Sequence, residues 1–235
     1  MRMDRRAGLL SISMLPALKD LFANTNYVKS AKRSSSSSTM GAAGSLTISV
    51  SDLTQNTPYY VFYVTGNNIE IAKIVYNGSS VTRTRLKYVG SRFFTVSGTT
   101  LSSDGNIYTG SFNILRFPNY SAEKIDAALS TLTLTLKAGT YRTQGQDTTT
   151  VGVASTAIVS DQNTIYLSSF VGPTAGTPLY MSFSAGSTIL TALSSSGGTS
   201  YAYLYYLSNS TQYVLSINGT SNRLVYGGGI YQLSY

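Results

Sequence analysis

Hydrophobic and polar residues alternate along much of the chain with a period of two, the repeat of a β-strand. The clearest examples are Leu46, Ile48 and Val50 and, further on, Leu132, Leu134 and Leu136. Because successive side chains of a strand point to opposite faces, this spacing predicts strands with one buried face. Residues 59–65 and 69–76 are more continuously apolar, and the Gly-Asn-Asn between them indicates a hairpin.

Residues 82–118 predict a further unit of two strands with a turn between them. The second strand covers residues 107–117, and the SSDG sequence at residues 102–105 supplies the turn. The first strand carries three cations on one face, with Leu86 and Tyr88 on the other; these cations are Arg83, Arg85 and Lys87. We call the three cations the basic strip.

The basic strip has two interpretations. Three cations two residues apart are expected to contact a phosphate backbone or an acidic neighbour. The alternative is an exposed strand whose charges prevent pairing at a sheet edge.

Short strands continue to the end of the chain, with one helix before them. Residues 119–129 have helical spacing of apolar residues, and Ser121 is the expected N-cap. The strands predicted after it are residues 132–137, 151–159, 164–170, 178–184, 188–193, 200–207, 212–217, 222–226 and 230–235, with a loop at 140–150. Together with 19 Tyr and 21 Gly, this succession predicts an all-β fold, a sandwich or a barrel.

Residues 1–42 differ in composition and predict a basic N-terminal arm with a Ser-rich linker, followed by one domain over residues 43–235. The first 33 residues hold seven basic and two acidic side chains, which is +5 of the net charge of +8. This charge is typical of a tail that binds a polyanion, and the alternative is a solubilising tail. The arm cations expected to contact nucleic acid are Arg2, Arg5, Arg6, Lys29, Lys32 and Arg33.

Part of the arm is expected to form a short amphipathic helix, since Leu10, Met14, Leu18, Leu21 and Phe22 fall near helical spacing. We expect this helix to dock on protein, either on its own domain or on a neighbouring subunit. Contact with a membrane surface is the less favoured alternative. The apolar run is too short to span a bilayer and lacks a convincing signal-peptide cleavage site.

The composition excludes several kinds of catalytic and metal site. The chain has no Cys and no His, so the Ser-His-Asp and Cys-His arrangements and all His-containing metal sites are absent. Its nine carboxylates are scattered, and Asp104 precedes Gly105 in a sequence more typical of a turn than of a calcium site. We therefore expect no catalytic residue, no metal ligand and no cofactor, and an enzyme is the weakest candidate.

One predicted strand carries three tyrosines on a single face, namely Tyr201, Tyr203 and Tyr205. Aromatic packing between strands or contact with another subunit is the favoured interpretation. A contact surface for a glycan is the alternative.

Residues 85–118 resemble the shell domain of small icosahedral RNA virus coat proteins, especially nodavirus-like coats. In that family an Arg-containing strand leads through a Ser to an apolar strand, a polar turn and a strand that ends in a basic residue and Pro. The positions that carry the resemblance are Arg85, Tyr88, Ser91, Phe93, Gly105, Ile107, Gly110, Phe112, Arg116 and Pro118. The resemblance implies a basic arm, a linker and a single jelly-roll β-sandwich, in that order. It carries over no catalytic or calcium-binding residue to this chain.

From this resemblance we expect a capsid protein of the virion that assembles with many copies of itself into an icosahedral shell. The arm and the basic strip would then contact the genome without reading its sequence, with RNA favoured over DNA. The basic strip would lie at an interior or intersubunit surface. The alternatives are an extracellular filament or surface-layer subunit that assembles by strand exchange, and a glycan-binding module.

Overall fold

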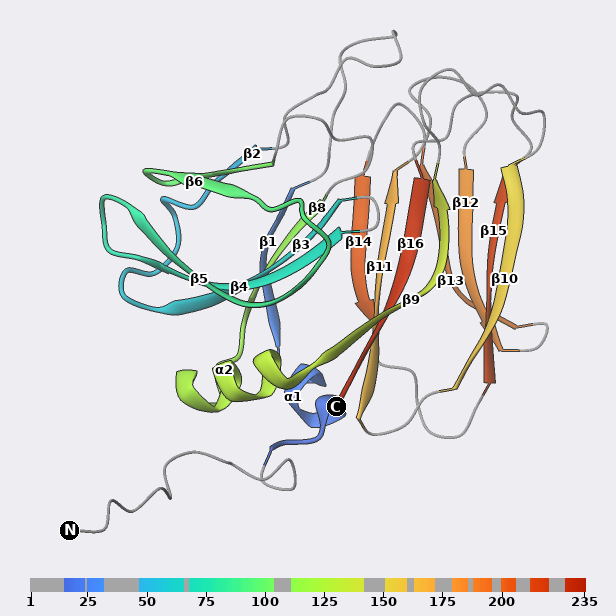
Figure 1. Ribbon diagram of the computed structural model, residues 1–235, viewed down its shortest axis with the longest axis horizontal. Helices are drawn as coiled ribbons and strands as arrows, with labels where there is room; N and C mark the ends of the chain where they lie inside the picture. The colour runs from blue at the N-terminus through green and yellow to red at the C-terminus, as the bar shows by residue number, and fades with distance from the viewer. Residues whose placement is uncertain are drawn as a thin grey trace, which may run out of the picture.

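The structure, a computed structural model, is built mainly of antiparallel β-sheets. It describes residues 15–23, 25–31, 47–65, 68–103, 111–141, 151–159, 163–171, 179–185, 188–195, 200–205, 212–219 and 227–235. Within these residues there are four sheets and two helices, so the prediction of an all-β fold is confirmed. The chain forms two groups of sheets (Figure 1), one from the strands before the second helix and one from the strands after it.

Sheet A is the centre of the first group. Its strands, in spatial order, are β1 (Asn26–Ala31), β8 (Ser111–Arg116), β3 (Pro58–Thr65), β4 (Asn68–Tyr76) and β5 (Val81–Val89). The predicted hairpin of β3 and β4 is confirmed, because Thr65 pairs with Asn68 across the turn. All residues from Tyr59 to Val64 are buried, which explains why β3 is apolar without alternation: both faces of sheet A are covered.

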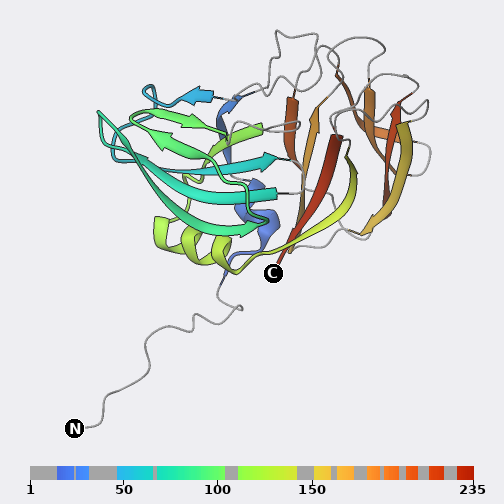
Figure 2. The ribbon, with the colours of Figure 1, turned by 45° about the horizontal axis from the view of Figure 1, so that its top comes forward.

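One face of sheet A is covered by sheet B, whose strands are β2 (Thr47–Ser49), β7 (Thr100–Ser102) and β6 (Thr95–Ser97). Figure 2 shows this small sheet lying across sheet A. Between them lies an apolar core that includes Val61, Ile74, Phe94, Leu101 and Phe112. The alternating Ile48 and Val50, predicted to be buried, are part of this core.

The other face of sheet A is covered by two helices, α1 (Leu18–Ala23) and α2 (Ala122–Thr131). The predicted helix after residue 119 is confirmed as α2. The Ser121 hydroxyl accepts a hydrogen bond from the Lys124 amide at 3.4 Å, as expected of an N-cap. Ile125, Ala128 and Leu129 form its buried side.

The second group consists of sheet C and sheet D, which lie next to each other in Figure 1, with sheet D at the far right. Sheet C contains β14 (Ser200–Tyr205), β11 (Thr164–Val171), β16 (Gly227–Ser234) and β9 (Thr133–Tyr141). Sheet D contains β10 (Val151–Val159), β15 (Gln212–Gly219), β12 (Leu179–Ala185) and β13 (Thr188–Ser195).

The pairings in these two sheets are nested along the chain. The first strand pairs with the last (β9 with β16), the second with the seventh (β10 with β15), the third with the sixth (β11 with β14), and the two middle strands pair with each other (β12 with β13). Two further pairings, β11 with β16 and β12 with β15, join these ribbons into the two sheets. The segment therefore folds as one long hairpin wound across two layers.

The two groups of sheets share an apolar core. Leu21 and Phe22 of α1 pack in the same cluster as Leu167 of β11 and Leu233 of β16. In addition, the Tyr235 hydroxyl donates a hydrogen bond of 2.9 Å to the carbonyl of Pro16. The beginning of the described chain is thus held against its end.

Part of the predicted N-terminal arm is packed in this way. Leu18 and Leu21 are fully buried, and β1 pairs with β8 at the edge of sheet A. The described residues between 15 and 31 therefore belong to the folded body. The expectation that the helix docks on its own domain is met by α1, while Leu10 and Met14 lie outside the described residues.

The prediction that residues 82–118 form one two-strand unit is wrong. β5 and β8 lie in the same sheet but are separated by β3 and β4, and the short β6–β7 hairpin lies between them in the chain. The Asp104-Gly105 turn and the predicted strand at 222–226 lie outside the described residues. The predicted loop after residue 140 begins later than expected, since β9 runs to Tyr141.

Candidate functional site

Glu70 is a fully buried carboxylate near the start of β4, between the buried Ile69 and Ile71. A carboxylate is rarely buried unless a cation or hydrogen-bond donors surround it. In the sequence, Glu70 is only one of nine scattered carboxylates. The signal that could have found it is a lone acidic residue inside an apolar strand, which demands a cation from a neighbouring strand.

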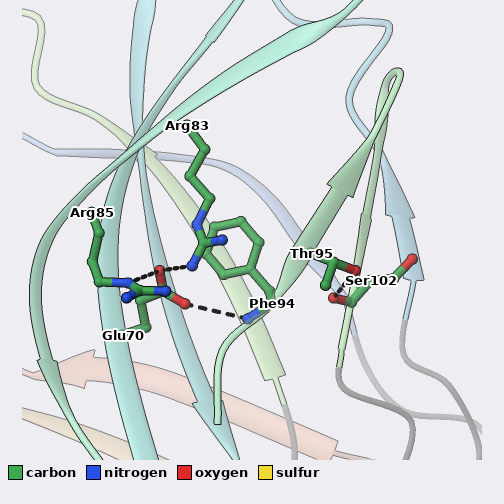
Figure 3. Close-up of polar contacts among 6 residues, drawn as sticks. All are labelled: Glu70, Arg83, Arg85, Phe94, Thr95 and Ser102. Atoms are coloured by element: carbon green, nitrogen blue, oxygen red, sulfur yellow. Dashed lines mark hydrogen bonds and ion pairs between the residues drawn. The ribbon is translucent and has the colours of Figure 1, made fainter. Parts of the chain in front are cut away.

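Two cations of the basic strip supply that charge (Figure 3). The Arg83 Nη2 atom forms an ion pair with Glu70 Oε1, and the Arg85 Nε atom contacts the same oxygen at 3.2 Å. The second carboxylate oxygen, Oε2, accepts a hydrogen bond from the Phe94 amide at 3.2 Å. Glu70 is thus held by two side chains of β5 and by the backbone ahead of β6.

Aromatic rings fix the planes of both guanidinium groups. The Arg83 guanidinium lies over the Phe94 ring at 4.2 Å, and that of Arg85 lies over the Phe93 ring at 3.7 Å. The Tyr88 ring is also near Arg85, at 5.2 Å. Such stacking is favourable for Arg and limits the directions in which its N–H groups point.

The turn after β5 places these rings. The Asn68 Oδ1 atom accepts hydrogen bonds from the backbone amides of Ser91 at 2.9 Å and Arg92 at 3.2 Å. Gly90 has a φ of +89°, and a Cβ atom there would lie 2.0 Å from Asn68 Oδ1. Only glycine fits this close approach, and the chain then leads directly to Phe93 and Phe94.

A β-bulge changes the expected arrangement of the basic strip. Ala72 pairs with Arg85 but Ile71 pairs with Lys87, so Leu86 is an extra residue in β5. Paired residues share a face, so Arg83 and Arg85 lie on the sheet B side with Ala72 and Ile74. Lys87 lies on the helix side with Ile71. The prediction that all three cations share one face is wrong, and Tyr88 joins the two arginines instead.

Of the arm cations expected to contact nucleic acid, the structure describes only Lys29. Lys29 lies on β1 and pairs with Asp52 at 2.8 Å, and this hydrogen bond holds the pKa of Asp52 below its usual range. Lys29 is therefore a residue of the folded body and not of a separate arm. Arg2, Arg5, Arg6, Lys32 and Arg33 lie outside the described residues, so their contact with nucleic acid stays a prediction.

A second polar cluster lies on the helix side of sheet A. Asp126 of α2 forms an ion pair with Lys73 and accepts a hydrogen bond of 3.0 Å from the Tyr60 hydroxyl. Burial and the neighbouring Asp126 raise the pKa of Tyr60. Glu123 of the same helix is exposed, and backbone hydrogen bonding lowers its pKa. The carboxylate of Asp126 therefore joins α2 to β3 and β4, which is a structural role.

Among the residues that the structure describes, no group of three or more acidic side chains is placed to hold a metal ion. No helix in the described part of the chain is long and apolar enough to cross a membrane. The three tyrosines lie on β14, where Tyr201 pairs with Phe170, Tyr203 with Ser168 and Tyr205 with Tyr166 of β11; the structure describes the backbone of this strand.

Comparison with known proteins adds no family to these observations. No family model matches the chain, and no curated protein matches its sequence.

Proposed function

We propose that this chain is a viral capsid protein, which assembles with many copies of itself into a closed icosahedral shell. The observation that carries the proposal is the nested pairing of β9 to β16 in sheets C and D. A long hairpin wound into two four-stranded sheets is the topology of a jelly roll, and jelly rolls form many viral capsid domains.

The proposed jelly roll is shorter than the sequence led us to expect. It comprises residues 133–234, whereas the expectation was one sandwich over residues 43–235. Sheets A and B with α2 would form a second layered unit ahead of it, joined to it through the core around α1. In the proposed shell, the two units would contact different neighbouring copies.

Arg2, Arg5 and Arg6 are the cations that we propose contact the packaged genome, RNA in preference to DNA. They lie ahead of Leu15 in the chain, where the described body begins, and they include none of the arginines engaged by Glu70. Counterion release from phosphates would supply affinity without base recognition. We propose no catalytic role, because the carboxylates nearest to cations, Glu70 and Asp126, are used in packing.

Assembly is tested by negative-stain electron microscopy of the purified full chain. We expect closed particles of uniform size. Fibres would favour the filament or surface-layer alternative, and a stable monomer over a wide concentration range would contradict both assembly roles.

Genome contact is tested by replacing Arg2, Arg5 and Arg6 with Gln and measuring the nucleic acid extracted per milligram of shells. The matched control replaces three cations of the body, Lys87, Arg116 and Lys124, and so removes the same charge. We expect a loss of nucleic acid in the first variant that clearly exceeds the loss in the control. Equal losses would overturn the assignment to the N-terminal arginines.

A further inference from the structure

An open cleft lies between β5 and the β6–β7 hairpin, beside the buried Glu70. Its volume is about 460 Å³, and it is lined by Val81, Arg83, Arg85, Val96 and Gly98. This volume is in the range of sites for small ligands. The polar groups of its lining side chains are the two guanidinium groups. A ligand in the cleft would therefore contact arginine side chains flanked by apolar residues.

The charge around the cleft is unbalanced. Two arginines share one carboxylate, which leaves a net charge of +1. Glu70 is fully buried, whereas the side chain of Arg83 is 20% exposed and that of Arg85 is 37% exposed. The excess positive charge therefore lies on the solvent side of the carboxylate, where a ligand can reach it.

The hydrogen-bond donors of the arginines are only partly used. Arg85 donates through Nε to Glu70, and among the described residues its two Nη atoms have no acceptor. The buried Nε of Arg83 likewise has no hydrogen-bond partner among the described residues. The Nη atoms of an arginine form a planar fork that matches two oxygens of a carboxylate or a phosphate.

We propose that this cleft binds a singly charged oxyanion, a carboxylate or a phosphodiester, through the Nη fork of Arg85. The ring contact with Phe93 and the bond to Glu70 hold that fork in place before the ligand arrives, which reduces the ordering cost of binding. One net positive charge balances one negative charge, so a monoanion fits better than a doubly charged phosphate ester. The inference goes beyond shell formation and does not depend on it.

The test is ligand-observed saturation-transfer NMR on the full chain, which detects weak binding to monomers and to large assemblies alike. The probes are N-acetylglycine, a carboxylate, and dimethyl phosphate, a phosphodiester. Their uncharged counterparts are N-acetylglycine methyl ester and trimethyl phosphate. We expect saturation transfer to at least one anion and little to either neutral ester, and the anion that binds identifies the class of ligand.

Two variants of the same strand assign the signal to the cleft. R85Q removes the fork and leaves Glu70 paired with Arg83, and we expect it to weaken binding about tenfold to a hundredfold, the value of a charged hydrogen bond. K87Q removes the same charge on the opposite face of β5 and should bind like the unmodified chain.

Three results would overturn the proposal: no transfer to either anion, equal transfer to the neutral esters, or equal binding by R85Q and K87Q. Circular dichroism and the urea midpoint of R85Q show whether its fold is retained. If R85Q is unfolded, R85K serves instead, because it keeps the charge but lacks the fork; binding by R85K equal to that of the unmodified chain would overturn the role of the fork. Electron microscopy measures shell formation separately, so a failure of ligand binding is distinguished from a failure of assembly.

Discussion

The charge of Glu70 is compensated by two cations of the next strand and one backbone amide, with no access to solvent. Burial of a carboxylate is tolerated only while these partners remain in place. The cluster therefore fixes how β4, β5 and the segment before β6 lie relative to one another, and it holds the rings of Phe93 and Phe94 under the arginines.

Replacing Glu70 with Gln should therefore destabilise the fold strongly. The variant leaves Arg83 and Arg85 without an anion, and breaking a buried ion pair costs about 3–5 kcal/mol of unfolding free energy. Urea unfolding measures the change. The matched control is Asp52→Asn, whose carboxylate is 67% exposed beside Lys29 and whose loss should cost less than about 1 kcal/mol. Equal changes in the two variants would contradict the structural role of Glu70.

The raised pKa values of three tyrosines predict that the fold loses stability at high pH. Burial raises the pKa of Tyr60 and of Tyr231, and it raises the pKa of Tyr235 to about 12. In the unfolded chain these hydroxyls lose their protons near pH ~10, before they do so in the folded chain. The contribution of each is therefore complete below pH ~10 and falls above it, by about 1.4 kcal/mol per pH unit.

Urea unfolding at several pH values from ~8 to ~12 measures this dependence. The variant Tyr60→Phe removes one of the three groups and should make the decline above pH ~10 less steep. A decline of unchanged steepness in this variant would show that Tyr60 does not contribute.

At the scale of elements, the sequence predicts best those features that depend on local pattern. The β3–β4 hairpin, α2 and the N-cap Ser121 follow from turn residues and apolar spacing, and the structure confirms them. Partner strands are different, because strand pairing is set by contacts far apart in the chain. β5 and β8 are close in sequence yet separated by two strands, and nothing in their own residues indicates this.

The candidate site could likewise be predicted only in part, because it also depends on strand pairing. Arg83 and Arg85 stand out by their spacing, but their common partner Glu70 comes from another strand and becomes visible only with the register of β4 and β5. The bulge at Leu86 has no Gly or Pro to mark it, so a strict period of two misplaced Lys87. A one-residue irregularity is enough to move a side chain to the other face.

Helix α1 lies within the predicted arm, yet it is part of the packed body. Leu21 is fully buried, and the Phe22 ring packs edge-on against Phe62 at 5.9 Å and Phe117 at 5.3 Å. The substitution Leu21→Ala should lower the free energy of unfolding by about 2–5 kcal/mol, the usual cost of a buried Leu. The control Val28→Thr on β1, 41% exposed, should change it by no more than about 0.5 kcal/mol. An unaffected Leu21→Ala variant would mean that α1 does not stabilise the body.

At the scale of the whole molecule, α1 joins the two groups of sheets. α1 packs between sheet A and strands β11 and β16, and the carbonyl of Pro16, two residues before the helix, accepts the hydrogen bond of Tyr235. Positive charge near the N-terminus and structural packing therefore occupy adjacent stretches of the chain, divided near residue 15. Two truncations can separate these roles.

Removing residues 2–13 deletes Arg2, Arg5 and Arg6 but leaves α1 and β1 in place. We expect this variant to keep its circular dichroism spectrum and its assembly, and to carry less nucleic acid. Removing residues 2–33 also deletes the buried Leu18, Leu21 and Phe22 and exposes β8 at the sheet edge, so we expect it to unfold or aggregate. If the longer truncation folds and assembles like the full chain, α1 and β1 are dispensable. If the shorter one fails to fold, the boundary lies nearer the start of the chain than residue 14.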